Sequence, residues 1–136
     1  MKKVQKGRSM IEMLGVLAII GVLSIGGLAG YTMAMNRHRA NQILDYVSRC
    51  AVAAQTKGDG YVITGESCSV LLPLETVPNG LGAFTVGAAA ASVLTYNITS
   101  PAIESDDIRT ALTNRSNINV TITASTDKKV TFTFKK

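Results

Sequence analysis

The pattern of hydrophobic and polar residues changes along the chain. Residues 11–29 read IEMLGVLAIIGVLSIGGLA, an apolar run long enough to span a bilayer as a helix, at about 1.5 Å of rise per residue. Residues 31–57 then place apolar side chains at three- and four-residue steps, which is typical of an amphipathic helix. Because Lys57-Gly58 provides a stop, we expect one helix over residues 9–57. Its apolar face comprises Ile43, Leu44, Val47, Cys50, Ala51 and Ala54, and Arg37, Arg39, Asp45 and Arg49 lie off this face.

Residues 58–136 alternate apolar and polar side chains in short stretches, which is the pattern of half-buried strands. The alternation is clearest at residues 118–122 and 130–134, which predict an antiparallel hairpin connected by residues 124–129. Residues 94–98 predict a further strand. Because the apolar face of the helix needs a covering layer, the expected fold class is α+β, with a long N-terminal α-helix packed against a small antiparallel β-sheet head.

Shorter signals lie between these elements. We expect two short strands, at residues 61–63 and 68–74, and a turn at Pro78-Asn79-Gly80. A short helix is expected at residues 107–112. Ser100 or Ser105 can cap that helix, which carries acidic residues in its first turn. Residues 81–91 are rich in glycine and alanine and predict no definite element.

The basic residues are concentrated at the N-terminus, ahead of the apolar run. Lys and Arg outnumber Asp and Glu by 14 to 9, but without the first seven residues the balance is 11 to 9. The remaining chain is nearly neutral and only 5% aromatic, so it gives little support for a nucleic-acid-binding surface. By the positive-inside rule, Lys2, Lys3, Lys6 and Arg8 keep the N-terminus cytoplasmic and place the rest outside the cytoplasm.

The chain contains two cysteines, Cys50 and Cys68, and an even count in an exported protein favours one disulfide over two buried thiols. The bridge would close about 17 intervening residues, which the chain-entropy model values at roughly 3 kcal/mol. The single histidine, His38, lies in the basic run Arg37-His38-Arg39 and has no partner ligand at zinc spacing. No metal site, cofactor site or catalytic constellation is predicted, and we do not expect an enzyme.

Glu12 interrupts the apolar run. A carboxylate at the centre of a membrane helix costs on the order of 2–3 kcal/mol, so such a residue normally has a partner. The partner is either Lys6 or Arg8, close in sequence and able to snorkel, or a group from another copy of the chain. A signal peptide cleaved near Ala29-Gly30, or a plain membrane anchor, would leave Glu12 unexplained.

The segment KGRSMIEMLGVLAIIGVLSIGGLAGY resembles the N-terminus of type IV prepilins, the precursors of pilins and of type II secretion pseudopilins. Gly7 falls where the family's leader ends, which implies cleavage between Gly7 and Arg8 by a prepilin peptidase. Glu12 then takes the family's acidic position. Gly21 and Tyr31 fall on its frequent mid-span glycine and on its frequent tyrosine just past the span. The resemblance covers roughly the first 31 residues.

The chain departs from the family pattern at two points. The family's N-methylation would fall on Arg8, where phenylalanine or another apolar residue is usual. Ala29 stands where the family commonly has proline. Gly26, Gly27 and Gly30 lie nearby, and since each glycine weakens a helix by about 1 kcal/mol relative to alanine, they would supply a point of helix flexibility.

The resemblance implies a pilin-like fold and a division of the chain. Residues 1–7 would be the leader peptide, residues 8–30 the transmembrane and filament-core half of the helix, residues 31–57 its amphipathic half, and residues 58–136 a globular β-rich head. As the family's subunits are understood, the acidic residue, here Glu12, pairs with the freed α-amino group of a neighbouring subunit. The Gly26-x-x-x-Gly30 spacing allows close helix approach.

The implied function is that of a structural subunit of a type IV pilus, serving adhesion, motility or DNA uptake. Its implied partners are the lipid bilayer before assembly, the prepilin peptidase, an inner-membrane assembly platform, and other copies of itself and related pilins in the filament. It would begin in the bacterial inner membrane and end in an extracellular pilus. Two alternatives stay open: a pseudopilin in a periplasmic type II secretion pseudopilus, and a membrane-anchored periplasmic binding module.

Overall fold

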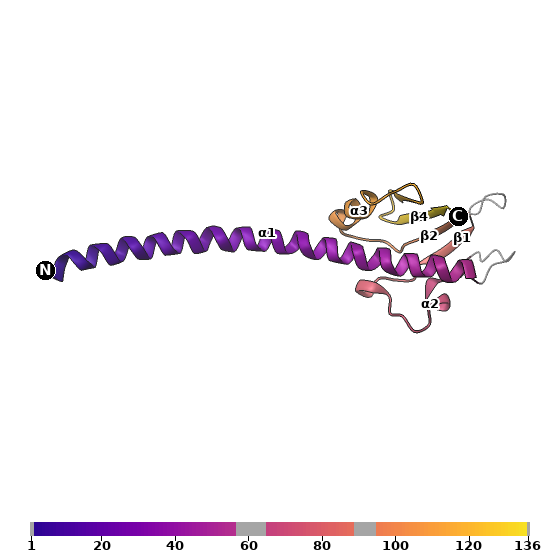
Figure 1. The fold of residues 1–136 in the computed structure, drawn as a ribbon, viewed down its shortest axis with the longest axis horizontal. Coiled ribbons are helices and arrows are strands. Elements are labelled where there is room, and N and C mark those ends of the chain that lie inside the picture. The colour runs from indigo at the N-terminus through magenta and orange to yellow at the C-terminus, as the bar shows by residue number, and fades with distance from the viewer. Residues whose placement is uncertain (1, 57–64, 89–94, 136) are drawn as a thin grey trace. The chain divides into compact units, whose positions relative to one another are not determined.

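The computed structural model describes residues 2–56, 65–88 and 95–135, which form an α+β chain with a long N-terminal helix and a small antiparallel sheet (Figure 1). The chain divides into two compact units, Met1–Met35 and Asn36–Lys136, and α1 contributes to both. In chain order the elements are α1 (Lys2–Thr56), α2 (Cys68–Leu71), the 3-10 turn η1 (Pro78–Gly80), β1 (Thr85–Ala88), β2 (Thr95–Thr99), α3 (Asp106–Thr113), β3 (Val120–Ala124) and β4 (Val130–Lys135).

Helix α1 confirms the predicted N-terminal helix. It starts at Lys2, ahead of the expected start at Ser9, because residues 2–8 contain no proline and include several good helix formers. It extends to Thr56, and the predicted stop at Lys57-Gly58 lies outside the described residues. In the unit Asn36–Lys136, the predicted apolar face is buried and the predicted polar positions are exposed. The buried residues, at most 2% exposed, are Ile43, Val47, Cys50, Ala51 and Ala54, Leu44 is partly buried, and the exposed ones are Arg37, Arg39, Asp45 and Arg49.

The sheet has four strands in the order β1-β2-β4-β3, and all neighbouring pairs are antiparallel. The predicted hairpin is confirmed as β3 and β4, with Ile122 opposite Phe132. The predicted strand at residues 94–98 corresponds to β2, which pairs with the other edge of β4. Ile98 of β2 also lies opposite Phe132 of β4. Strand β1 lies in the segment for which no element is predicted from sequence, and it pairs with β2.

The prediction that Ile118 belongs to the buried face of the hairpin is wrong. Its side chain is 86% exposed, and β3 begins at Val120. The Asn117 side chain accounts for this difference, because its Oδ1 accepts backbone N–H hydrogen bonds from Asn119 at 2.9 Å and from Val120 at 2.8 Å. The resulting turn delays the start of the strand.

The predicted strand at residues 68–74 is also wrong, since Cys68–Leu71 is the short helix α2. Cys68 and Leu71 are three residues apart, so one helical turn brings both toward the core, which a strand would not do. The chain just before α2 is extended instead. Cys68 N–H donates to the Phe84 carbonyl and Gly65 N–H to the Val86 carbonyl, both at 2.8 Å. The candidate strand at residues 61–63 lies outside the described residues.

Helix α3 confirms the predicted short helix, with Ser105 as its N-cap residue and acidic residues in its first turn. Ser100 instead pairs with the start of β4, since its N–H donates to the Val130 carbonyl at 2.8 Å and its Oγ accepts a hydrogen bond from the Val130 N–H at 2.9 Å. One core joins the buried face of α1 to the sheet and to both short helices. Its other members are Ala40, Tyr46, Cys68, Leu71, Phe84, Val86, Ile98, Ile103, Ile108, Leu112, Ile122, Val130 and Phe132.

Candidate functional site

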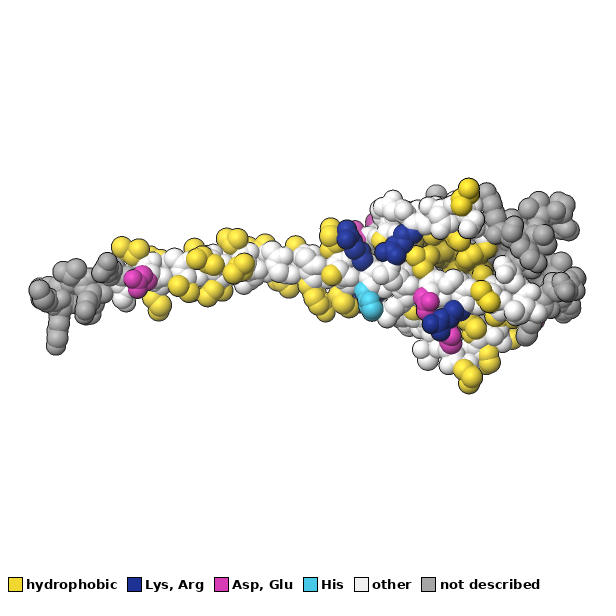
Figure 2. All heavy atoms as spheres, viewed as in Figure 1, with side chains coloured by type: hydrophobic (Ala, Val, Ile, Leu, Met, Phe, Trp, Pro, Cys, Tyr) yellow, Lys and Arg dark blue, Asp and Glu magenta, His cyan; other side chains and the backbone are white. Residues whose placement is uncertain are grey.

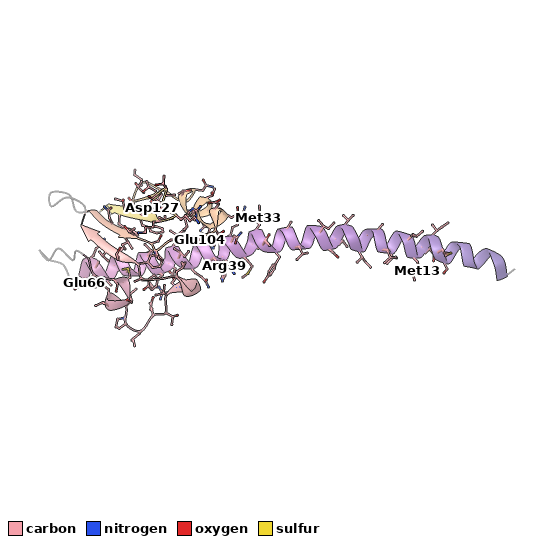
Figure 3. All side chains as sticks on the ribbon, turned by 180° about the vertical axis from the view of Figure 1, so that it is seen from behind. Met13, Met33, Arg39, Glu66, Glu104 and Asp127 are labelled. Atoms are coloured by element: carbon pink, nitrogen blue, oxygen red, sulfur yellow. A yellow bond between two sulfur atoms is a disulfide. The ribbon has the colours of Figure 1, made fainter. Side chains whose placement is uncertain are left out.

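Residues 9–35 expose apolar side chains on all sides of α1. All the side chains from Ser9 to Ala34 are exposed, and the large hydrophobic ones range from 52% exposed at Ile20 to 75% at Ile25. Figure 2 shows the hydrophobic groups along this segment, and Figure 3 shows side chains, Met13 among them, extending from it in several directions. The helix is long and apolar enough to cross a membrane. A surface of this kind needs lipid or protein around it.

The polar groups of this segment fall into two kinds. Ser24 Oγ donates to the Ile20 carbonyl at 2.7 Å and Thr32 Oγ1 donates to the Ala29 carbonyl at 3.0 Å, so both hydroxyls are satisfied within the helix. Glu12, in contrast, is the only charged residue between residues 9 and 35, and its side chain is exposed. Among the side chains that the structure describes, none forms an ion pair with Glu12.

The other residues on which the resemblance to prepilins rests are spread along the same helix. Gly7 and Arg8 lie within α1, which continues through the predicted cleavage point, so the helix bounds do not mark that point. Gly21 is helical with open space where a Cβ would be, and Tyr31 is 63% exposed. At about 1.5 Å per residue, the steps from Glu12 to Gly21 and from Gly21 to Tyr31 are each about 14–15 Å. Within one chain these residues therefore form no cluster.

Gly26, Gly27 and Gly30 lie in uninterrupted helix. A Cβ added at any of them would meet nothing within 4 Å. At about 100° per residue, Gly26 and Gly30 are roughly 40° apart around the helix, so they lie on one face. Glu12 lies five full turns before Gly30 and therefore on the same face. No described part of the chain occupies the space beside these glycines.

The predicted disulfide is present. Cys50 Sγ and Cys68 Sγ are 2.04 Å apart, their Cα atoms are 5.6 Å apart, and both residues are 0% exposed. The bridge fastens α2 to the last two turns of α1.

An ion-pair network lies beside the disulfide. Arg49 binds Glu75 at 2.8 Å and Asp45 at 3.0 Å. The hydrogen bond with Glu75, followed by the charge of Asp45, raises the pKa of the Arg49 guanidinium. The Asp45–Arg49 spacing of four residues is a helix-pair signal in the sequence, whereas no sequence signal marks Glu75, which lies 26 residues away.

Tyr46 belongs to the core and lies near Glu75 of this network. Its ring packs against Phe84 with the ring centroids 5.4 Å apart, and its hydroxyl is buried without a hydrogen-bond partner among the described residues. Burial, and then the charge of Glu75, raise the pKa of Tyr46. Among the described residues, no group of three or more His, Cys, Asp or Glu side chains is placed to hold a metal ion.

No protein-family model, curated protein or solved structure matches this chain. The function is therefore argued from the residues and their placement.

Proposed function

We propose that this chain is a type IV pilin-like structural subunit, anchored in the membrane as a precursor and polymerised through its N-terminal helix. One observation carries the proposal. Residues 9–35 expose an apolar helical surface on all sides, whereas the described residues from Asn36 onward bury a core of their own. A head that is already closed does not need the apolar segment, so that segment is free to serve lipid first and neighbouring subunits later.

Glu12 favours a filament over a plain anchor. In a lipid-embedded monomer its carboxylate is unfavourable, whereas in a filament the α-amino group freed at Arg8 of a neighbouring subunit can neutralise it. An unpaired charge in a low dielectric is costly, so this pairing selects one axial register between helices. A plain membrane-anchored binding module would have no use for the residue.

The precursor would lie in the bacterial inner membrane with its leader, residues 1–7, in the cytoplasm. A prepilin peptidase would cut between Gly7 and Arg8, Arg8 would be the residue that is N-methylated, and an inner-membrane platform would add the subunit to the filament. The mature chain would then begin at Arg8, with the disulfide-closed head on the filament surface.

N-terminal sequencing of the chain from its native host, combined with electron microscopy of sheared surface material, tests this proposal. We expect the mature chain to begin at Arg8 and to be present in surface filaments. A mature chain that begins at Met1, or after Ala29, would rule out the pilin-like function. Processing at Arg8 without surface filaments, with the chain retained in the periplasm, would instead identify the pseudopilin alternative.

A further inference from the structure

Arg37, His38 and Arg39 form a short basic collar on α1, directly after the apolar segment along the chain. All three side chains are exposed. At about 100° per residue they point to three sides of the helix, and the fourth side belongs to Ala40 and Ile43, both buried in the head. The collar therefore surrounds α1 wherever the head does not cover it.

The two arginines of the collar are not committed to acidic partners within the described residues. The ion pairs there are made by the cations Arg49, Arg109 and Lys128. The nearby acid Asp107 accepts a hydrogen bond from Asn36 Nδ2 at 3.3 Å, and Asp106 is paired with Arg109. His38 Nε2 lies 3.2 Å from Gln42 Nε2, on the same helix. The collar thus presents two guanidinium groups to its surroundings.

We infer that Arg37 and Arg39 bind the phosphate groups of anionic phospholipids on the non-cytoplasmic face of the membrane while the precursor is anchored there. This inference rests on the proposed membrane-anchored state. Tyr31 is exposed and lies six residues, or about 9 Å of helix rise, before Arg37, and an aromatic side chain in that position favours the membrane interface. The next two turns then bring the guanidinium groups to the depth of the phosphates, which they bind through charge-assisted hydrogen bonds.

The collar does not conflict with the orientation of the chain, because Lys2, Lys3, Lys6 and Arg8 outnumber its two arginines. A nucleic acid is a poorer partner for the collar. Protein–DNA contacts typically neutralise about 6–10 phosphates, and the collar offers two permanent charges next to an apolar segment. A lipid bilayer has an apolar layer followed by a phosphate layer. The apolar segment and the collar follow each other along the chain in the same order.

The test uses the full chain, with its disulfide intact, reconstituted in phosphatidylcholine vesicles with and without phosphatidylglycerol. A fluorophore on His38→Cys is quenched by headgroup-labelled forms of each lipid, and this quenching yields the relative association constant of the two lipids at the collar. We expect phosphatidylglycerol to be preferred, and Arg37→Gln/Arg39→Gln to reduce that preference by about 5-fold per arginine. The matched control is Arg115→Gln/Lys129→Gln, which removes the same charge from exposed positions elsewhere on the head and leaves the preference unchanged.

A second label, on Met13→Cys, reports insertion through quenching by acyl-chain-labelled lipid. If Met13 is not quenched, the membrane-anchored state fails, and the proposed function fails with it. If Met13 is quenched but the collar shows no preference for phosphatidylglycerol, the collar inference alone is overturned. The same holds if Arg37→Gln/Arg39→Gln and Arg115→Gln/Lys129→Gln lose that preference equally. Loss of the preference on addition of a DNA oligonucleotide at the same phosphate concentration would likewise overturn it, in favour of a nucleic-acid partner.

Discussion

The Cys50 and Cys68 side chains are bonded to each other inside the core, where both residues are 0% exposed. Cys68 is also held through its backbone, since its N–H donates to the Phe84 carbonyl at 2.8 Å. The sulfur bridge thus joins α1 to the segment that pairs with the start of β1. The bridge therefore fixes the start of α2 on α1.

The first prediction concerns this bridge. The double substitution Cys50→Ala/Cys68→Ala should lower the free energy of unfolding of the head by about 3 kcal/mol, since the loop-closure restraint on the unfolded chain is lost. Urea unfolding in detergent, followed by the near-UV circular dichroism of the tyrosines, measures the change. Because a single substitution leaves an unpaired thiol, the double variant is the cleaner comparison. Two titratable thiols in the denatured wild-type protein, exported and unreduced, would contradict the bridge itself.

The second prediction concerns the buried hydroxyl of Tyr46. Tyr46→Phe should leave the free energy of unfolding unchanged or raise it by up to about 1 kcal/mol, because a buried hydroxyl without a partner is unfavourable and the ring contact with Phe84 is kept. Phe84→Ala is the control for that contact and should cost about 3–5 kcal/mol. A loss above about 1 kcal/mol in Tyr46→Phe would mean that the hydroxyl has a partner.

The same substitution predicts a change at alkaline pH. The folded-state pKa of Tyr46 is raised above its ordinary value of 10.0, so the neutral phenol is favoured in the fold. Below pH 10.0 the phenol is neutral in both the folded and the unfolded chain and adds no pH dependence; as the pH rises from 10.0 through the raised pKa, the unfolded chain ionises first and the fold loses stability. Tyr46→Phe should therefore retain more of its stability above that pH than the wild-type chain does.

The third prediction concerns Glu104, whose carboxylate pairs with Lys128. The hydrogen bond and charge of Lys128 lower the pKa of Glu104 below its ordinary value of 4.5. The stabilising effect is therefore present above pH 4.5 and is lost as the pH falls through the lowered pKa. Because the pair is exposed, Glu104→Gln should cause only a small decrease in Tm at neutral pH, and the difference from wild type should vanish in acid. Asp127→Asn is the control, since Asp127 is exposed and makes no ion pair within the described residues. Figure 3 labels Asp127 and Glu104.

These features differ in how far the sequence could predict them. Helix α1 follows from long runs of apolar periodicity, and the β3–β4 hairpin from strict alternation, so local patterns were sufficient for both. The disulfide follows from the even cysteine count combined with the expectation of export. In each case the signal lies in the residues that form the element.

The missed features depend on contacts far along the chain. Cys68–Leu71 is too short to show a period, and it becomes helical because Cys68 must reach Cys50 while Leu71 reaches the core. Strand β1 carries glycine and alanine, and its pairing with β2 determines it more than its own residues do. For the assembly positions proposed from sequence, the described side chains form no ion pair with Glu12. A partner on a neighbouring subunit lies beyond what a single chain can show.

The fourth prediction separates close helix packing from helix flexibility at the glycines. Gly26→Ala and Gly27→Ala each remove one glycine and should stabilise the helix equally, by about 1 kcal/mol, and neither new methyl group meets another atom within 4 Å in the chain. If Gly26 permits close approach of a neighbouring helix, Gly26→Ala should reduce filament yield while Gly27→Ala, about 100° around the helix, does not. Equal losses in both variants would instead support a flexible point, and equal normal yields would support neither role. Yield is counted in sheared material at matched membrane levels of the subunit.

The fifth prediction concerns Glu12. Glu12→Ala and the near-isosteric Glu12→Gln should both insert normally into the membrane, because each removes a charge from the apolar segment. Both should abolish or severely reduce filament assembly, because the α-amino group of the neighbouring subunit would be buried without a counter-charge. Breaking a buried pair costs about 3–5 kcal/mol, or more than 100-fold in the equilibrium for adding a subunit.

Glu104→Gln is the control for Glu12, since it removes an acid of equal charge from the head and should assemble normally. Membrane fractionation measures insertion, and filament counts in sheared material measure assembly. Normal filament yield in Glu12→Gln would contradict the pairing role, since the glutamine keeps the shape of the side chain and lacks only its charge. Reduced insertion in the same variant would point instead to snorkelling partners for Glu12 within its own chain, namely Lys6 and Arg8.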